Sequence, residues 1–397
     1  MKKGWEYKRL KDVGLTQTGS TPSKLVKSYY GGDVPFIRPA ELNIDNNGAI
    51  EYNSEIKLTA EGVSKSRLIK ANSILMCCIG SVGKTGYSEY DVTCNQQINS
   101  ITPYIGYFPK FVYYALLSPE FQKKAITIAN SAKATLPIIS KGKWEELQIP
   151  VPPLTEQQSI VSYLDAAFAK IDAMKANAEK ALSEAKALFQ ASLKELLTPK
   201  KGWEEKKLKD LGQTQTGTTP SKSDKTNYGD FMEFIRPSEI DYDGNGGIDY
   251  NCEMKLSEQG ASKGRIFASN SIFMVCIGAT IGKVGFSTKE ISCNQQINIF
   301  TPNDEINYKF AYYAMRSPSF QHRVVKEGTS SQATLPIINK GKWEQLPISF
   351  PAIKEQEKIA SHLDNLSDKV KSLQVNYEKI SAECDALKQA ILRQVFE

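Results

Sequence analysis

Two long segments of the chain carry a sustained heptad pattern of apolar positions. The first runs from about Leu154 to Leu197 without any Gly or Pro, and the second occupies residues 352–397. Apolar residues alternate spacings of four and three, which is typical of coiled-coil helices, and about 40 residues of helix span roughly 60 Å. The predicted seams are Ile160, Leu164, Ala167, Ile171, Met174, Ala178, Ala181, Ala185, Leu188 and Ser192, and then Ile359, Leu363, Leu366, Val370, Leu373, Tyr377, Ile380, Cys384, Leu387 and Ile391.

The two seams differ in side-chain size. The first is mostly small after its opening turns, and the second is mostly large. We therefore expect the two helices to pack on each other as an antiparallel coiled coil, with small residues opposite large ones. The alternative, in which each helix lies separately on its own globular domain, stays open at this point.

The rest of the chain has the pattern of a mixed, strand-rich protein. Short apolar runs at 73–79 and 272–277 are bounded closely by turn residues, which predicts strands. Helical patterns at Phe108–Ile128 and Tyr308–Lys326 are each interrupted by a Ser-Pro pair. The expected fold class is α+β, with two similar strand-rich domains separated by the two long helices.

The chain is an internal duplication. Gly4-Trp5-Glu6 recurs as Gly202-Trp203-Glu204, and after one inserted residue Cys94–Asn99 recurs as Cys293–Asn298. A period near 200 residues is too long for a solenoid repeat, so each copy is a domain with an appended helix, and two copies favour a pseudo-two-fold arrangement. The predicted boundaries are 1–152 for the first domain, 153–198 for the first helix, 199–351 for the second domain and 352–397 for the second helix.

Composition and charge narrow the class of partner. The net charge is +6, and the excess of Lys and Arg falls in residues 1–150 and 199–349, whereas the helical segments are slightly acidic. This distribution fits nucleic-acid binding. Seven cysteines without a Cys-x-x-Cys pair favour buried thiols in a reducing compartment. Without an apolar run of membrane-spanning length or a signal-peptide pattern, we expect a soluble, cytoplasmic protein.

No catalytic constellation can be assembled from the motifs. Gly80-Ser81-Val82-Gly83-Lys84 resembles a phosphate-binding loop, but Cys78 stands where that loop needs its first Gly, so a strand-turn-strand is expected. Pro152-Pro153 lacks the polar and aromatic neighbours of an amino-methyltransferase motif. Two histidines, both in helical contexts, support neither a metal cluster nor a Ser-His-Asp arrangement. We expect no enzyme activity, no cofactor and no metal.

The order of motifs resembles that of type I restriction-modification specificity subunits. The resemblance rests on Gly-Trp-Glu followed by Lys-Leu-Lys-Asp, Thr18-Gly19-Ser20-Thr21-Pro22, the Gly80–Lys84 turn, Asn95-Gln96, and the helix entry from Pro150 to Ile160. The second helix entry departs from the first in lacking the double proline. The likeness covers essentially the whole chain, because the same motif order occurs twice.

The resemblance implies a non-catalytic subunit that binds double-stranded DNA. In that family each globular domain is a target recognition domain for one half of a bipartite site, and the helices form a spacer. The subunit docks two methyltransferase (modification) subunits and, in the restricting complex, two restriction endonuclease subunits. Membranes are not among its partners.

Candidate DNA contacts are basic or hydroxyl side chains at matched loops, which suit phosphate binding. Arg38 and Arg236, each between Ile and Pro, can equally be structural, and the identical Asn-Gln-Gln runs favour a framework role. The candidates are Ser20, Thr21, Lys24, Lys27, Lys65, Arg67, Lys84 and Lys133 in the first copy, and Thr218, Thr219, Lys222, Lys225, Lys263, Arg265, Lys283 and Gln332 in the second.

Loops that differ between the copies are where the half-sites can differ, so we expect base-reading residues there. These loops are 25–33 against 223–230, 43–47 against 241–245, 87–92 against 286–291, and 130–133 against 329–332. Two other classes remain in competition: a coiled-coil scaffold whose two domains bind a ligand other than DNA, and a fused methyltransferase-nuclease.

Overall fold

The chain folds into two compact units that share both long helices. The computed structural model describes residues 4–43, 48–53, 55–131, 135–241, 246–329 and 335–397. Unit 1 comprises Met1–Asn177 and Lys379–Glu397, and unit 2 comprises Ala178–Glu378. Helix α6 (Leu154–Leu196) and helix α12 (Ile353–Phe396) therefore each contribute to both units.

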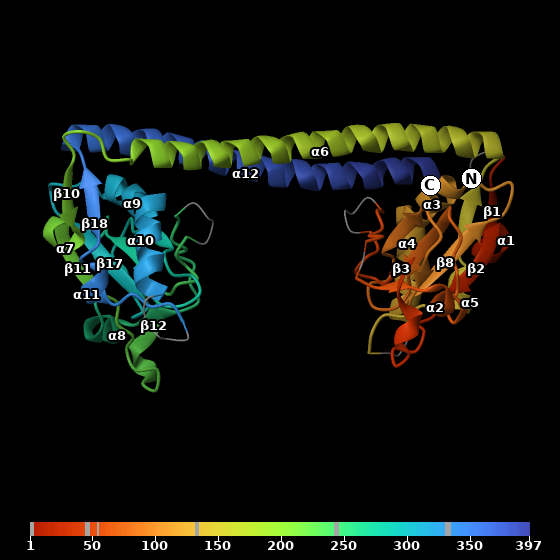
Figure 1. The fold of residues 1–397 in the computed structure, drawn as a ribbon, viewed down its shortest axis with the longest axis horizontal. Helices are drawn as coiled ribbons and strands as arrows, with labels where there is room; N and C mark the ends of the chain where they lie inside the picture. Colours follow the sequence, from red (N-terminus) through yellow and green to blue (C-terminus); the bar gives the residue numbers. More distant parts are fainter. Residues whose placement is uncertain (1–3, 44–47, 54, 132–134, 242–245, 330–334) are drawn as a thin grey trace. The chain divides into compact units, whose positions relative to one another are not determined.

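Unit 1 is built on a four-stranded antiparallel sheet and two smaller strand groups (Figure 1). The four-stranded sheet has the order β2 (Gly14–Thr18), β8 (Ile98–Pro103), β5 (Ser73–Cys77) and β6 (Thr85–Ser88). Strand β3 (Tyr30–Ile37) pairs antiparallel with β4 (Lys57–Leu58) and parallel with β7 (Thr93–Cys94), and β1 (Glu6–Arg9) pairs antiparallel with β9 (Gln148–Val151). The short helices are α1 (Leu10–Val13), α2 (Ala60–Ser64), α3 (Pro109–Leu117), α4 (Pro119–Asn130) and α5 (Lys141–Glu145), with the 3-10 turn η1 (Lys27–Tyr29).

Unit 2 repeats this architecture strand for strand. Its four-stranded sheet has the order β11 (Gly212–Thr216), β17 (Ile297–Pro302), β14 (Ile272–Val275) and β15 (Val284–Phe286). Strand β12 (Tyr228–Ile235) pairs with β13 (Lys255–Leu256) and β16 (Ser292–Cys293), and β10 (Glu204–Lys207) pairs with β18 (Pro347–Phe350). The short helices are α7 (Leu208–Leu211), α8 (Glu258–Lys263), α9 (Tyr308–Arg316), α10 (Pro318–Thr329) and α11 (Lys340–Trp343), with the 3-10 turn η2 (Lys225–Asn227).

The local elements follow from the sequence pattern. The apolar run at 73–79 forms β5, whose five residues are all buried. Ser118 ends α3 and caps α4, where its hydroxyl accepts a hydrogen bond from the Phe121 N–H at 3.4 Å. Gly80 and Gly83 have φ angles of 80° and 95° in the turn between β5 and β6. The predicted strand-turn-strand and the Ser-Pro helix break are therefore confirmed.

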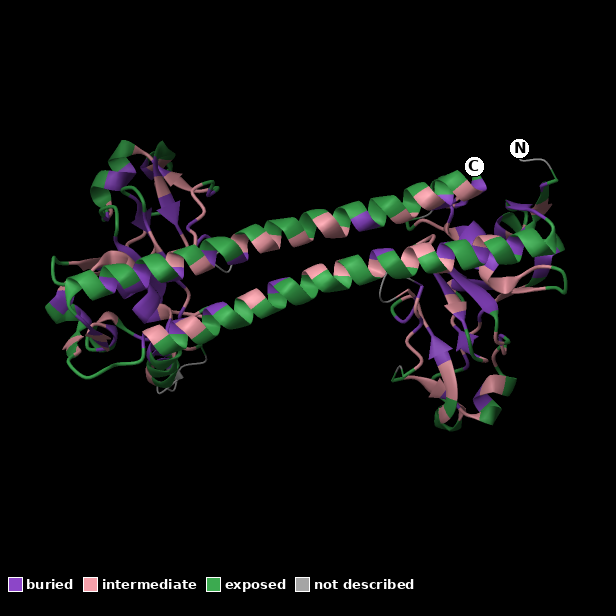
Figure 2. Cartoon of the chain, turned by 90° about the horizontal axis from the view of Figure 1, so that it is seen from above, coloured by how far each residue is buried: buried purple, intermediate pink, exposed green. Residues whose placement is uncertain are grey.

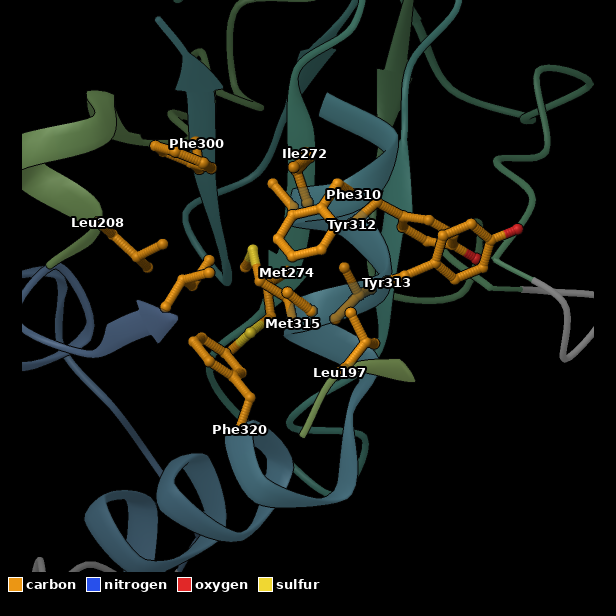
Figure 3. Packing of buried hydrophobic residues seen from close by; sticks show 14 of the residues in the cluster. Leu197, Leu208, Ile272, Met274, Phe300, Phe310, Tyr312, Tyr313, Met315 and Phe320 are labelled. Atoms are coloured by element: carbon orange, nitrogen blue, oxygen red, sulfur yellow. The ribbon is translucent and has the colours of Figure 1, made fainter. Parts of the chain in front are cut away.

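Aromatic and sulfur-containing side chains fill the core of each unit. In unit 2, Met274 on β14 lies among Phe310 and Met315 of α9 and Phe320 of α10 (Figure 3). Leu193, in the last turn of α6, and Leu197, directly after that helix, belong to the same core. Unit 1 is completed in the same way by the end of α12, where the Phe396 ring lies 5.5 Å from the Phe111 ring between centroids. Each core therefore depends on the last turns of one long helix.

One buried glutamine attaches the start of each long helix to its domain. In unit 1, the Gln157 Oε1 accepts a hydrogen bond from the Phe108 N–H at 2.8 Å, and its Nε2 donates to the Pro152 carbonyl at 2.9 Å. In unit 2, Gln356 makes the same two bonds with Asn307 and Pro351, at 2.8 and 2.9 Å. A buried amide whose donor and acceptor are both satisfied fixes one orientation, so the helix leaves each domain in the same way.

A second polar junction holds each helix about two turns further along. The Tyr114 hydroxyl donates to Asp165 at 2.5 Å, and Lys110 donates to the other oxygen of that carboxylate at 3.0 Å. Unit 2 repeats the triad as Tyr313, Lys309 and Asp364. Burial, together with the neighbouring carboxylate, raises the pKa of Tyr114, so this phenol stays protonated and remains a donor.

Within unit 1 the two helix segments run antiparallel. Lys175 pairs with Asp385 at 3.5 Å and Asp172 pairs with Lys388 at 2.5 Å, so position numbers rise along one segment as they fall along the other. The Cys384 thiol donates to the Ile171 carbonyl at 3.7 Å. In unit 2, Lys186 donates to the Gln374 amide oxygen at 2.9 Å. Paired helices are thus confirmed within each unit, whereas the pseudo-two-fold relation stays a prediction.

The buried face of α6 includes only part of the predicted seam. Ile171 is buried as expected, but Met174 and Leu188 are each 58% exposed. Buried residues recur along both long helices on an otherwise exposed surface (Figure 2). The face shifts because it must cover a domain as well as the partner helix: Val161 belongs to the core of unit 1 and Phe189 to that of unit 2.

The predicted α+β class, with two strand-rich domains and two long helices, is confirmed. The predicted domain boundaries stay a prediction. Among the helices of the described residues, none is long and apolar enough to cross a bilayer.

Candidate nucleic-acid interface

The loops after β2 and after α2 bring several predicted contacts together in unit 1. We call Ser20, Thr21, Ser66, Arg67 and Gln96 the hydroxyl cluster of unit 1. The Thr21 hydroxyl donates to the Gln96 amide oxygen at 2.7 Å, and the Ser66 hydroxyl donates to the Ser20 carbonyl at 2.7 Å. Arg67 donates to the carbonyl of Thr18, the last residue of β2. Three segments that are distant in sequence, around residues 18–21, 66–67 and 96, thus form one polar surface.

The close approach that builds this surface requires glycine. A Cβ on Gly19 would lie 2.2 Å from the Asn95 carbonyl oxygen, and the matched Gly217 is as tightly placed against Asn294, at 2.1 Å. No side chain fits at that distance, so the Thr-Gly-x-Thr-Pro motif has a packing reason. It places the hydroxyl residues that follow directly beside the Asn-Gln-Gln turn.

Unit 2 contains the matching hydroxyl cluster, formed by Thr218, Thr219, Arg265 and Gln295. Thr219 donates to Gln295, and Arg265 donates to the Thr216 carbonyl at 2.7 Å. One contact differs, because Gly264 stands where unit 1 has Ser66. The Thr218 hydroxyl is buried and has no hydrogen-bond partner among the described residues.

Lysines surround these clusters. Lys24 and Lys27 are exposed in the loop that follows the hydroxyl cluster of unit 1, and Lys65 is exposed directly after α2. In unit 2, Lys222 and Lys225 are exposed at the matched places. Lys263 differs from its counterpart Lys65 because it donates to Asp224 at 3.1 Å and to the Asn227 amide at 2.9 Å.

Four of the predicted contacts lie apart from the clusters or cannot be placed. Lys84 and Lys283 sit on the turn between two strands of the four-stranded sheets, and the Lys84 ammonium donates to the Pro39 carbonyl at 2.8 Å. Lys133 and Gln332 lie outside the described residues.

Arg38 and Arg236 have a structural partner, as their position between Ile and Pro allowed. Arg38 donates through Nε to both carboxylate oxygens of Glu41, at 3.1 and 3.0 Å, and Arg236 pairs with Glu239 at 2.8 Å. Burial raises the pKa of Glu41, but the bonds from the Arg38 side chain and backbone outweigh it, so that the pKa lies below its ordinary value. Both guanidinium groups hold the segment that follows β3 or β12.

The Asn-Gln-Gln turns are internally bonded in both units. Asn95 donates to the Gln97 amide oxygen at 2.8 Å and accepts from the Gln97 N–H at 3.1 Å, and Asn294 does the same with Gln296. Gln96 is exposed and holds Thr21. The sequence favoured a framework role for the whole run and so missed Gln96 and Gln295 as members of the surface. In each turn the two flanking amides bond each other and leave the middle glutamine on the surface. Only the folded structure shows this difference.

The arrangement offers hydrogen-bond donors and positive charge rather than nucleophiles. All seven cysteines are buried, and burial raises the pKa of Cys94 to about 12, which leaves a protonated, unreactive thiol. Among the described residues there is no group of three His, Cys, Asp or Glu side chains that could hold a metal ion. Hydroxyl, amide and lysine groups on a loop surface suit phosphate oxygens.

Comparison with solved structures identifies the class of fold. A chain from a structure described as showing complex assembly and conformational transition of the type I R-M system superposes with a TM-score of 0.76 at 18% identity, covering 100% of this chain and 98% of the other. The HsdS subunit from Thermoanaerobacter tengcongensis superposes with a TM-score of 0.59 at 18% identity, covering 100% and 97%. The chain therefore has the fold of the HsdS subunit and of that chain from a type I R-M system.

Sequence comparison then gives the family. Residues 2–183 and 200–382 each match the type I restriction modification DNA specificity domain, so the chain belongs to that family. The EcoBI specificity subunit of Escherichia coli is 26% identical over 99% of this chain and 81% of its own length. The MjaIX specificity subunit of Methanocaldococcus jannaschii and the HindI subunit of Haemophilus influenzae are 29% and 35% identical, over 41% and 34% of this chain. Those two matches span 37% and 29% of the relatives' own lengths.

Proposed function

We propose that this chain is the DNA-recognition subunit of a type I restriction-modification complex, in which each domain reads one half of a bipartite site. The observation that carries the proposal is the repeated hydroxyl cluster. Thr21–Gln96 and Thr219–Gln295 make the same bond, and Arg67 and Arg265 bond matched backbone carbonyls. Two matched polar surfaces, which share these bonds but differ where Gly264 replaces Ser66, suit two stretches of one repeating polyanion.

The subunit itself is not an enzyme in this proposal. Buried thiols with raised pKa and the hydrogen-bonded hydroxyls of the clusters are poor nucleophiles, which supports a recognition role. Methyl transfer then belongs to modification subunits, of which two would dock on the two halves, and cleavage belongs to endonuclease subunits of the restricting complex. Members of both hydroxyl clusters, together with Lys24, Lys27, Lys65, Lys222, Lys225 and Lys263, hold phosphates in the proposal.

The proposal is tested on the full chain co-expressed with its methyltransferase partner. Sequencing of methylated positions in host DNA gives the motif, and binding to duplexes at several salt concentrations gives the phosphate contribution. We expect a bipartite motif and an affinity that falls steeply with salt. A complex without sequence preference, or with salt-independent binding, contradicts the proposal and favours a scaffold whose two domains bind a ligand other than DNA.

Single lysines sharpen this test. Replacing Lys24 by Ala, or Lys222 by Ala, should weaken binding to all sequences equally and reduce the salt slope by about one, with the motif unchanged. The matched control is Lys180→Ala on α6, where the lysine is exposed and paired with Glu184 of the same helix. This control should leave both affinity and slope unchanged.

A further inference from the structure

Leu25 is an almost fully exposed leucine between two lysines in the loop that follows the hydroxyl cluster of unit 1. The residue is 93% exposed, and Lys24 and Lys27 on either side are also exposed. A single apolar side chain on a surface is common and needs no special cause. A leucine flanked by cations and adjoining a surface of phosphate-binding character is a more specific arrangement.

The loop that carries Leu25 is held at both ends. The Tyr30 hydroxyl donates to the Pro22 carbonyl at 2.6 Å, and the Val26 N–H donates to the Ser23 carbonyl at 3.2 Å. On the other side, the Thr59 hydroxyl donates to the Ser28 carbonyl at 2.7 Å. Leu25 therefore projects from a braced loop, and a braced loop can present one side chain in a fixed place.

The matched loop of unit 2 has different chemistry. Ser223 and Asp224 replace Leu25 and Val26. The Asp224 carboxylate accepts a hydrogen bond from the Thr226 N–H at 3.1 Å and forms an ion pair with Lys263 at 3.1 Å. The negative charge of Asp224 therefore partly neutralises the charge of Lys263. In unit 1 the places of Asp224 and Asn227 are taken by Val26 and Tyr29, which offer no carboxylate or amide to Lys65. The unit 1 loop is therefore both more apolar and more positive.

In duplex DNA, an apolar group lies between negative charges wherever a thymine occurs. The C5-methyl group of thymine projects into the major groove, flanked by the phosphates of the backbone, and apolar side chains contact it. A tight turn that presents an exposed leucine with a lysine on each side offers the same kinds of group, an apolar side chain between two cations.

We propose that Leu25 reads a thymine methyl group in the half-site bound by unit 1, with Lys24 and Lys27 on the neighbouring phosphates. The inference rests on the proposed DNA-recognition function and adds a specificity-determining residue to it. Unit 2 reads its half-site without this contact, because Ser223 cannot bury a methyl group in the same way. The two half-sites then differ at the base pair that faces this loop.

The test uses the full chain with its methyltransferase partner and duplexes containing deoxyuridine. Deoxyuridine lacks only the C5-methyl group and keeps the pairing of thymidine. After the motif is known, each thymine of the site is replaced in turn. We expect one replacement, in one half-site, to weaken wild-type binding roughly four-fold, the value of one buried methyl group. The Leu25→Ser variant should bind the thymine duplex more weakly and show no response to that replacement.

Phe231 provides a matched control in the other unit. It is 59% exposed on β12, where the register with β13 shifts, and Asp33 stands at its place in unit 1. The Phe231→Asp variant should keep the deoxyuridine response of the Leu25 half-site. Lys24→Ala should lower affinity for the thymine and deoxyuridine duplexes by the same factor.

Several outcomes overturn the inference without touching the proposed function. One is a Leu25→Ser variant that keeps both the wild-type motif and the deoxyuridine response, and another is a wild-type site whose half-sites contain no responsive thymine. A Leu25→Ser variant that no longer co-purifies with its methyltransferase partner, while its deoxyuridine response in duplex binding is unchanged, would make Leu25 a protein contact. Loss of all sequence preference in the wild type would instead refute the proposed function.

Discussion

Gln157 accepts a hydrogen bond from the backbone N–H of Phe108 across the junction between helix and domain. The distance is 2.8 Å, and Gln356 repeats the bond with Asn307 at the same distance. Because the amide also donates to the Pro152 carbonyl at 2.9 Å, both its polar ends are used. The helix is thereby attached by a side chain that tolerates only one orientation.

Replacing Gln157 by Leu should destabilise unit 1 by about 1–3 kcal/mol, because the partly buried Phe108 N–H and the Pro152 carbonyl lose their partner. Urea unfolding of the full chain measures the change. The neighbouring Gln158 is exposed, and Gln158→Leu should change the stability by less than about 0.5 kcal/mol. Equal effects of the two substitutions would contradict the anchoring role.

Glu41 and Glu239 should contribute to loss of stability in acid. The pKa of each lies below its ordinary value of 4.5, because the bonds from Arg38 or Arg236 outweigh the effect of burial. A lowered folded pKa means that the contribution is fully present above pH 4.5 and is lost as the pH falls through the folded pKa. The double variant Glu41→Gln with Glu239→Gln should therefore show a flatter decline of unfolding free energy below pH 4.5 than the wild type.

Removing one partner of the ion pair between Asp172 and Lys388 should lower the free energy of unfolding more than removing both partners. The Lys388 side chain is 12% exposed and its ammonium also lies 5.4 Å from the Phe168 ring centre. Either Asp172→Leu or Lys388→Leu alone should cost about 1–3 kcal/mol, whereas the double variant should be near neutral or more stable. A double-mutant cycle by chemical unfolding measures this coupling, and additive costs would contradict it.

The long helices should set the distance between half-sites. Inserting one heptad in phase after Asn177 and another after Glu378, where the two units divide, keeps each seam continuous. Under the proposed function, this lengthens the non-specific spacer by about 10 Å, or roughly three base pairs. Methylome sequencing of the variant gives the new spacer, and an unchanged spacer would show that the helices are not a ruler.

Much of this architecture could be predicted because the two halves of the chain repeat the same motifs and can be compared with each other. The duplicated motifs gave two strand-rich domains, and the Ser-Pro breaks and the Gly80–Lys84 turn followed from backbone chemistry. The seam was harder, since Lys175 and Lys388 enter it through ion pairs with residues that are distant in sequence. A count of apolar residues cannot include a lysine whose partner is unknown.

The candidate interface was likewise predictable from the sequence only in part. Thr21 and Arg67 could be proposed from residue type and loop position, and the fold brings them into one cluster. Lys84 has the same sequence signature, yet the fold places it on the turn between β5 and β6, where its ammonium donates to the Pro39 carbonyl and not to a member of the cluster. Gln157 and Gln158 are identical in type and adjacent, and only tertiary packing makes the first an anchor and the second a surface residue.

The division of the chain into units also orders its folding during synthesis. Unit 2 is one continuous stretch, Ala178–Glu378, so all of its residues are synthesised one after another. Unit 1 is made first but must wait, because Leu392 and Phe396, which complete its core, are translated only after the whole of unit 2. We therefore expect unit 1 to complete its core after unit 2, with part of its apolar surface exposed until the end of α12 has been synthesised.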